Sequence, residues 1–140
     1  MQVKQIMNPN PKYLTTDMSV TDAAKRMSEL DCGFLPVGSN DRLDGVVTDR
    51  DIVLRAVAKE KDLSSFNVGE ILSDKVLYCF EDDSVEEAAT SMRRQQVQRL
   101  VVLNNRDEKR LSGIITLGDI AKAGRGDLVG ETTEHIKQVA

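Results

Sequence analysis

Two threonine–aspartate pairs are the side chains of this chain best suited to bind a ligand. A glycine, two β-branched residues, a threonine, any two residues and an aspartate follow one another twice. The pairs are Thr48 with Asp51 and Thr116 with Asp119. A carboxylate accepts hydrogen bonds and a hydroxyl either donates or accepts, so such a pair can bind the two neighbouring hydroxyls of a ribose.

The same spacing also has a purely structural explanation. A threonine N-cap with an aspartate three residues later makes a capping box, and Ser19 with Asp22 repeats that spacing elsewhere. The apolar run before each threonine predicts a strand that leads directly into a helix. The free N–H groups and positive dipole end of that helix then form an anion site. Capping and ligand binding therefore both stay open, and neither excludes the other.

Both pairs belong to an internal repeat. Identical residues recur at an offset of 65, which becomes 68 after three extra residues near positions 105–109. Self-similarity at a fixed period indicates a repeated structural unit. We therefore expect two copies packed around a pseudo-two-fold axis. The matching residues include Val3/Val68, Ile6/Ile71, Tyr13/Tyr78, Val20/Val85, Met27/Met92, Leu35/Leu100 and Gly45/Gly113.

Each copy is predicted to form a strand, a helix, two strands and a second helix. Ser19 and Ser84 are expected to cap the first helices, whose apolar residues follow the i, i+3, i+4, i+7 spacing. The second helices are expected to begin at Thr48 and Thr116. The predicted division is residues 3–58 for repeat 1, 59–67 for a connector, 68–124 for repeat 2 and 125–140 for a tail that forms a short helix.

Composition and charge argue against several classes of protein. A formal net charge of -4 gives no basic footprint for nucleic acid. No apolar run has the length of a signal-peptide core or a membrane span, so the cytoplasm is expected. Cys32, Cys79 and His135 are too few for a zinc site or a disulfide scaffold, and the two cysteines are expected to be small buried hydrophobes. The sequence contains no convincing catalytic constellation.

With these motifs in place, the chain resembles the cystathionine β-synthase (CBS) domain family over about residues 3–124. The marks are Ile6-Met7, Leu35-Pro36-Val37 and the doubled Gly-hydrophobic-hydrophobic-Thr-x-x-Asp motif. Two copies in one chain resemble a CBS pair, or Bateman module. The resemblance implies an α+β fold of tandem β-α-β-β-α repeats. It also implies clefts between the repeats that bind AMP, ADP, ATP, NAD or S-adenosylmethionine.

The resemblance also assigns roles to residues. The Thr/Asp pairs would bind ribose, apolar backbone of the first and middle strands would flank the adenine, and arginines would contact phosphate. The residues implied are Thr48, Asp51, Arg50, Thr15, Phe34, Val47, Thr116, Asp119, Arg99, Phe80 and Ile115. Arg50 and Arg55 would favour a ligand with phosphate groups at the first pair. Arg99 would do the same at the second pair. The chain departs from the family pattern at Val101, where the first copy has Pro36.

These features favour a stand-alone regulatory module that binds an adenosyl ligand and signals to an unidentified effector protein. The resemblance adds a homodimer in which two pairs form a flat disk through their helices. The first alternative is a structural or oligomerisation module without a physiological ligand. The second is an enzyme, which turnover of a nucleotide would reveal.

Overall fold

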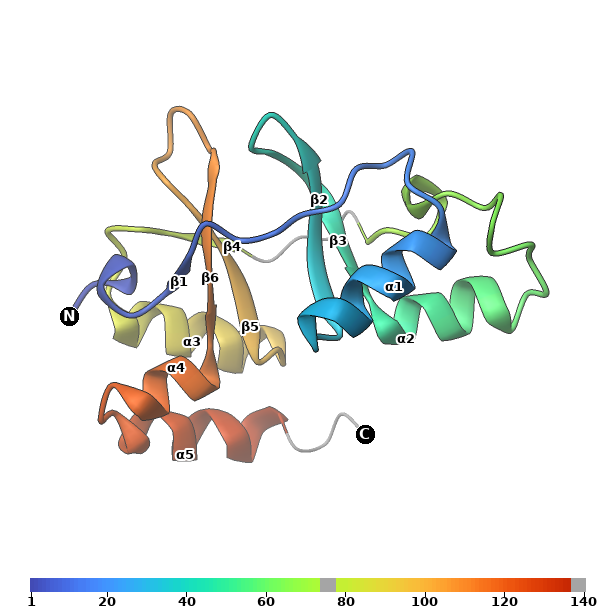
Figure 1. Ribbon diagram of the computed structural model, residues 1–140. Helices are drawn as coiled ribbons and strands as arrows, with labels where there is room; N and C mark the ends of the chain where they lie inside the picture. The colour runs from blue at the N-terminus through green and yellow to red at the C-terminus, as the bar shows by residue number, and fades with distance from the viewer. Residues whose placement is uncertain (74–77, 137–140) are drawn as a thin grey trace. The chain divides into compact units, whose positions relative to one another are not determined.

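The chain folds into two compact units. The computed structural model describes residues 1–73 and 78–136 (Figure 1). Unit 1 comprises Met1–Pro11 together with the described part of Leu77–Ala140, and unit 2 comprises the described part of Lys12–Val76. Both units mix helices with strands, which confirms the predicted α+β class.

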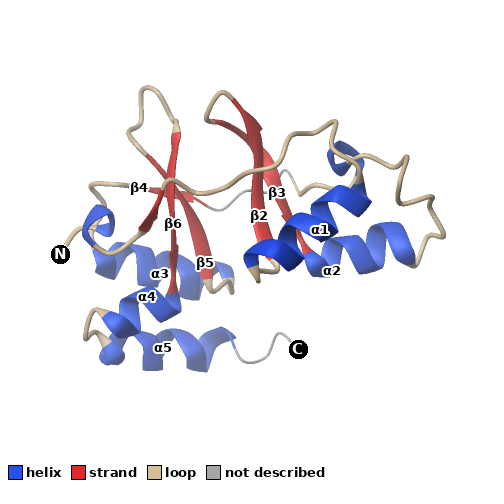
Figure 2. Cartoon of the chain, in the orientation of Figure 1, coloured by secondary structure: helices blue, strands red, loops and turns tan. Residues whose placement is uncertain are grey.

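Unit 2 is built around an antiparallel hairpin. Leu14 adds a parallel bridge to Val37, and Ser73 adds an antiparallel bridge to Val46 on the second hairpin strand. The elements in chain order are α1 (Val20–Leu30), β2 (Phe34–Ser39), β3 (Arg42–Thr48), α2 (Asp49–Ile52), its π-helical continuation η2 (Val53–Val57) and the 3-10 turn η3 (Val68–Glu70). Helices α1 and α2 lie beside the hairpin (Figure 2), and their buried apolar residues share one core with it.

Unit 1 repeats this plan with a larger sheet. Its strands follow the order β1-β6-β5-β4, in which β4 is parallel to β5 and the other pairs are antiparallel. The elements are the 3-10 turn η1 (Val3–Gln5), β1 (Asn8–Pro9), β4 (Tyr78–Phe80), α3 (Val85–Gln95), β5 (Arg99–Leu103), β6 (Leu111–Thr116), α4 (Leu117–Lys122) and α5 (Gly126–Ile136). The predicted β-α-β-β-α order is therefore present from β4 to α4.

The first residues of each repeat pack in the unit that holds the rest of the other repeat. In unit 1 the N–H of Val3 donates to the carbonyl of Asp83 at 2.8 Å, and β1 pairs with β6. In unit 2 the N–H of Val68 donates to the carbonyl of Met18, also at 2.8 Å. Val3 and Val68 are fully buried. The structural units thus do not coincide with the sequence repeats. The predicted division of the sequence stays a prediction, with boundaries at 3–58, 59–67, 68–124 and 125–140.

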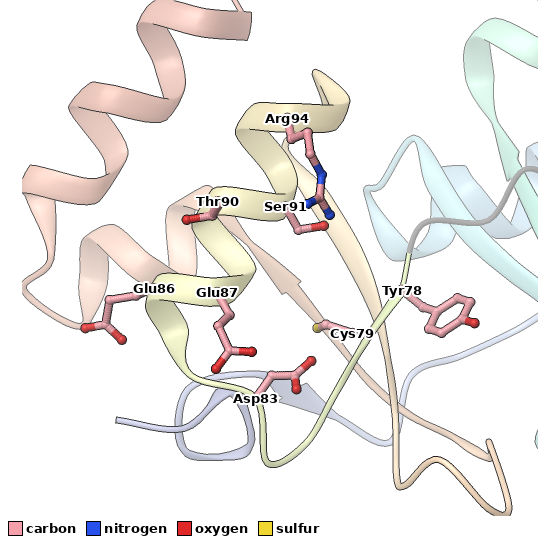
Figure 3. A pocket seen from close by; sticks show the side chains of 8 residues that line it. All are labelled: Tyr78, Cys79, Asp83, Glu86, Glu87, Thr90, Ser91 and Arg94. Carbon is pink, nitrogen blue, oxygen red and sulfur yellow. The ribbon is translucent and has the colours of Figure 1, made fainter.

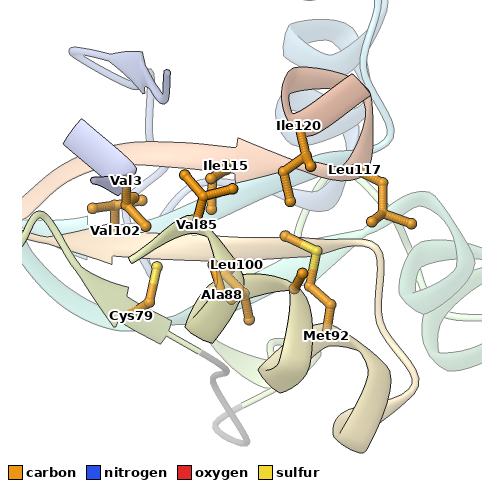
Figure 4. Packing of buried hydrophobic residues seen from close by; sticks show 11 residues of the cluster. Val3, Cys79, Val85, Ala88, Met92, Leu100, Val102, Ile115, Leu117 and Ile120 are labelled. Carbon is orange, nitrogen blue, oxygen red and sulfur yellow. The ribbon is translucent and has the colours of Figure 1, made fainter. Parts of the chain in front are cut away.

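The helical stripes predicted from sequence form the two cores. Val85, Ala88 and Met92 of α3 are buried together with Leu100 and Ile115 (Figure 4). The corresponding stripe of α1 is buried in unit 2. Ser19 and Ser84 cap the helices as predicted, because each hydroxyl accepts the N–H of the residue three positions later. The cores hold the strand ends that carry the threonines.

The predicted tail helix is α5, and residues 137–140 of the tail lie outside the described residues. It contacts α3 and α4, with Leu128 and Val129 packed against the core of unit 1. Ala89 of α3 is consequently only 3% exposed. Its repeat equivalent in unit 2, Ala24 of α1, is exposed. Helix α5 therefore covers a face in unit 1 whose counterpart in unit 2 is open.

Candidate functional site

Strand register sets the surroundings of the two Thr/Asp pairs. Thr48 ends β3 opposite Phe34, and Thr116 ends β6 opposite Arg99. Because Phe34 and Arg99 are also repeat equivalents, the two sites have the same backbone plan with different neighbours. The structure therefore places Phe34 beside the first pair and Arg99 beside the second, and a ligand contact by either stays a prediction.

Both pairs form complete capping boxes. The N–H of Asp51 donates to Oγ1 of Thr48 at 3.1 Å, and the N–H of Thr48 donates to Oδ2 of Asp51 at 2.9 Å. The corresponding distances for Thr116 and Asp119 are 3.1 Å and 2.8 Å. The structural role that the sequence left open is thus realised at both positions.

Capping leaves hydrogen-bonding capacity at each pair. The threonine oxygen accepts one bond, so its hydroxyl proton can still be donated to a ligand. The aspartate uses Oδ2 for the cap, and a carboxylate has a second oxygen that accepts further bonds. One donor and one acceptor side by side match a vicinal diol. The observed caps are therefore compatible with ribose binding.

The two aspartates have different neighbours. Nε of Arg55 lies 3.8 Å from Oδ1 of Asp51, and the same guanidinium donates through NH1 to the carbonyl of Ile71 at 3.1 Å. In unit 1 the amide of Asn8 donates to Oδ2 of Asp119 at 2.9 Å. A cation thus lies beside the first carboxylate and a neutral amide beside the second.

The motif glycines have a steric role. A Cβ on Gly45 would lie 2.6 Å from the carbonyl oxygen of Ser73, and a Cβ on Gly113 would lie 2.8 Å from that of Asn8. A Cβ essentially never lies within 3.0 Å of a heavy atom of a distant residue in real proteins, and a backbone carbonyl cannot turn away as a side-chain end can. Glycine is therefore needed at these two positions, because the backbone of Ser73 or of Asn8 pairs closely with the strand that leads to the threonine.

The remaining residues suggested by the resemblance are spread over each unit. Val47 and Ile115 are fully buried in the cores, so only their backbone is available to a ligand. Thr15 is exposed and donates to Asp17 at 2.5 Å. Arg50 is exposed on α2. The Phe80 ring lies 4.4 Å from the Arg106 guanidinium, a cation–π contact.

Sequence reasoning missed three neighbours of the pairs. Asn8 reaches Asp119 from a strand more than 100 residues away, and no local signal predicts that contact. Val46 and Ile114 are partly exposed and alternate with the buried Val47 and Ile115. The two-residue period of a strand places them on the same face as the threonines, a signal that was available in the sequence.

A separate hollow of about 430 Å³ lies along α3 and β4. Figure 3 shows its acidic and hydroxyl side chains on α3, together with Tyr78 and Cys79 of β4. None of its lining residues belongs to the set implied by the resemblance. Burial, reinforced by the negative charge of Asp83, raises the pKa of the Cys79 thiol to about 12. The thiol therefore stays protonated near neutral pH and is a poor nucleophile.

Neither a metal site nor a membrane span is found in the described part of the chain. Among the described side chains, those of residues 1–73 and 78–133, no group of three or more from His, Cys, Asp or Glu is arranged to hold a metal ion. No helix in these ranges combines the length and the apolar character that crossing a bilayer requires.

Comparison with known proteins links this fold to one family. The sequence profile described as CBS domain matches residues 3–57 and 68–126. Hypoxic response protein 1 of Mycobacterium tuberculosis is 38% identical over 120 residues, which cover 85% of this chain and 82% of that protein.

Three solved structures are similar over most of both chains. Hypoxic Response Protein I with two coordinated zinc ions is 36% identical, with a TM-score of 0.78 over 88% of this chain and 98% of that one. The CBS domain pair of protein MJ0100, in complex with 5′-methylthioadenosine and S-adenosyl-L-methionine, is 27% identical, with a TM-score of 0.76 over 91% and 98%. CBSX2 in complex with AMP is 26% identical, with a TM-score of 0.74 over 90% and 97%.

Proposed function

Because this chain belongs to the CBS domain family, we propose that it is a regulatory module that binds an adenosine-containing ligand at its two Thr/Asp pairs. Binding changes the conformation or assembly of the protein, and an effector protein reads that change. The module performs no chemistry on the ligand. The compartment predicted from the sequence remains the cytoplasm.

One observation supports ligand binding most strongly. Each capping box leaves a threonine hydroxyl proton and a carboxylate oxygen side by side, in both units. Two structures of similar fold contain adenosyl ligands, AMP in one and 5′-methylthioadenosine with S-adenosylmethionine in the other.

Nearby cations indicate the part of the ligand beyond the ribose. Arg50 and Arg55 lie on the helix that begins at Thr48, and Arg99 lies opposite Thr116. Guanidinium groups pair well with phosphate oxygens. AMP, ADP, ATP and NAD are therefore the first ligands to test, and S-adenosylmethionine tests an adenosyl ligand without phosphate.

We predict that one of these ligands raises the melting temperature of the protein. A ligand at about 100 times its dissociation constant stabilises the folded state by roughly 2.7 kcal/mol. Thermal-shift assays and calorimetry with each of the five compounds measure this effect. If all five give neither heat nor a shift, the structural module without a ligand takes the place of this proposal.

We also propose that the protein is a homodimer joined through α1, α2 and η2 of unit 2. In η2, Val53, Leu54 and Val57 are 53%, 45% and 51% exposed. In unit 1 the equivalent positions are Ala121, Lys122 and Arg125, beside a face that α5 already covers. The same face of a second copy supplies a helix with apolar residues of matching spacing, as an isologous interface requires.

Replacing Val53 by Glu is predicted to raise the dissociation constant of the dimer at least about 10-fold. A carboxylate left unpaired in an apolar interface costs more than about 1.4 kcal/mol. Sedimentation equilibrium measures the constant. Ala121→Glu is the matched control, because Ala121 is the exposed repeat equivalent and should leave the dimer unchanged. A parent protein that is monomeric at every concentration would exclude this interface.

A further inference from the structure

Arg55 of unit 2 connects two segments through its guanidinium, although 51% of its side chain is exposed. Its NH1 donates to the carbonyl of Ile71 at 3.1 Å, and its Nε lies 3.8 Å from Oδ1 of Asp51. The guanidinium thus joins the helix that begins at Thr48 to the segment that packs in from the second repeat. Because the chain is a repeat, the equivalent position in unit 1 can be compared directly with this contact.

The repeat offsets identify that position. Asp51 and Arg55 correspond at an offset of 68 to Asp119 and Ala123, and Ile71 corresponds at an offset of 65 to Ile6. The guanidinium of the first copy is therefore replaced by a methyl group in the second. Unit 1 has a surface cavity at this place that is wide open to solvent. Ile6, Asp119, Lys122 and Ala123 line it, and its volume is about 240 Å³.

The cavity keeps the equivalents of the two residues that Arg55 contacts in unit 2. Both Ile6 and Asp119 line it, and Asp119 is partly exposed. In the described part of unit 1, the hydrogen-bond donors to Asp119 are the Thr116 N–H and the Asn8 amide, which are neutral. No guanidinium donates to Asp119 in this part of the chain, although the Lys122 ammonium lines the same cavity.

We propose that this cavity binds the guanidinium group of a small molecule, in the place that the Arg55 side chain occupies in unit 2. Pockets for drug-sized ligands have about 300–1,000 Å³, so this cavity fits a small head group. A planar guanidinium presents several N–H donors and can address the carboxylate and the carbonyl together. The site shares Asp119 with the proposed nucleotide site and does not need a nucleotide to form.

Lys122 is expected to lower the affinity of the cavity for a cationic ligand. It lines the cavity and is exposed, whereas its repeat equivalent in unit 2 is Leu54. An ammonium beside the cavity repels a cationic ligand, and two like charges at short range oppose each other even in water. Lys122→Leu should therefore strengthen binding of a guanidinium compound.

Agmatine and putrescine form a matched pair of probes, because both carry an amine and only agmatine carries a guanidinium. In a titration of ¹⁵N-labelled protein followed by NMR, agmatine should shift the amide signals around Asp119 and Ala123, with one molecule bound per chain. Putrescine should bind at least about 10-fold more weakly. Asp119→Asn should weaken agmatine binding by a similar factor, because a charge-assisted hydrogen bond is lost.

Two further variants exchange the residues found at the equivalent positions 55 and 123 of the two repeats. Ala123→Arg should fill the cavity with its own guanidinium and abolish agmatine binding. Arg55→Ala should open the equivalent cavity and add a second bound molecule, with shifts around Asp51 and Ile71. Melting curves establish that both variants fold. Either variant alone tests whether the cavity in unit 1 corresponds to the place of the Arg55 side chain in unit 2.

The proposal is overturned if agmatine moves no signal near Asp119, if putrescine binds as tightly, or if Ala123→Arg binds agmatine as the parent does. None of these results bears on nucleotide binding. AMP titrated into the Ala123→Arg variant reports separately on the ribose site at Thr48 and Asp51.

Discussion

The Asp51→Asn variant is expected to bind nucleotide in unit 2 roughly 10- to 150-fold more weakly than the parent. Asparagine keeps the size and one acceptor oxygen but removes the charge that strengthens hydrogen bonds from a diol. Such charge-assisted bonds contribute about 1.5–3 kcal/mol, which gives this range of affinity. Calorimetric titration measures the change, and Asp119→Asn should show it in unit 1 while leaving unit 2 nearly unaffected.

Stability distinguishes ligand binding from capping in the same variants. A carboxylate in the first turn of a helix contributes about 0.3–1 kcal/mol, and the amide oxygen of the substituted side chain could still accept the Thr48 N–H. The melting temperature without ligand should therefore fall only slightly. Unchanged nucleotide affinity together with that small loss would show that Asp51 acts as a cap alone.

Gly113→Ala is expected to lower the free energy of unfolding by about 1–3 kcal/mol, the usual cost of overpacking. The added methyl group would lie 2.6 Å from Sδ of Met7 and 2.8 Å from the carbonyl oxygen of Asn8. Relief of this clash displaces the strand that pairs with β6 and breaks the bond from Asn8 to Asp119. Urea denaturation measures the loss, and nucleotide affinity in unit 1 should fall with it.

Gly130→Ala is the matched control for this variant. Gly130 lies in α5, and a Cβ there meets no atom within 4 Å. Alanine in a helix is more stable than glycine by about 0.5–1 kcal/mol, so this substitution should be neutral or stabilising. Equal losses for the two variants would mean that the close approach at Gly113 is not the cause.

Local patterns predicted most elements of the fold. The spacing of Val85, Ala88 and Met92 identified the buried face of α3, and Ser84 marked its first turn. Thr116 likewise marked the start of α4. These signals succeed because capping and amphipathic spacing act within a few residues of the chain. In the first repeat the same spacing identified Val20, Ala23 and Met27 of α1, but Leu30 at the end of that stripe is 39% exposed.

Contacts between distant residues could not be predicted in this way. β1 pairs with β6 through Asn8 and Ile114, and nothing in the local sequence near Asn8 specifies that partner. Ala24 and Ala89 are identical residues at equivalent positions, yet only Ala89 is buried, because α5 follows the second repeat alone. Burial at these positions depends on whether a segment outside the repeat, such as α5, packs on the helix.

The candidate site was predicted in part. The sequence identified both Thr/Asp pairs and left capping and ribose binding open. The structure shows the caps, and ribose binding stays a prediction. The resemblance implied Val47 and Ile115, whose side chains are buried in the cores, whereas Val46 and Ile114 lie on the threonine face.

The most direct test of the account is an NMR titration of the ¹⁵N-labelled protein with AMP and, separately, with S-adenosylmethionine. At least one ligand should produce saturable shifts at the amides of Thr48 and Asp51 or of Thr116 and Asp119, because these N–H groups take part in the caps that ribose would contact. Saturable binding of either ligand that leaves all four amides unmoved would contradict the claim that these pairs are ligand sites.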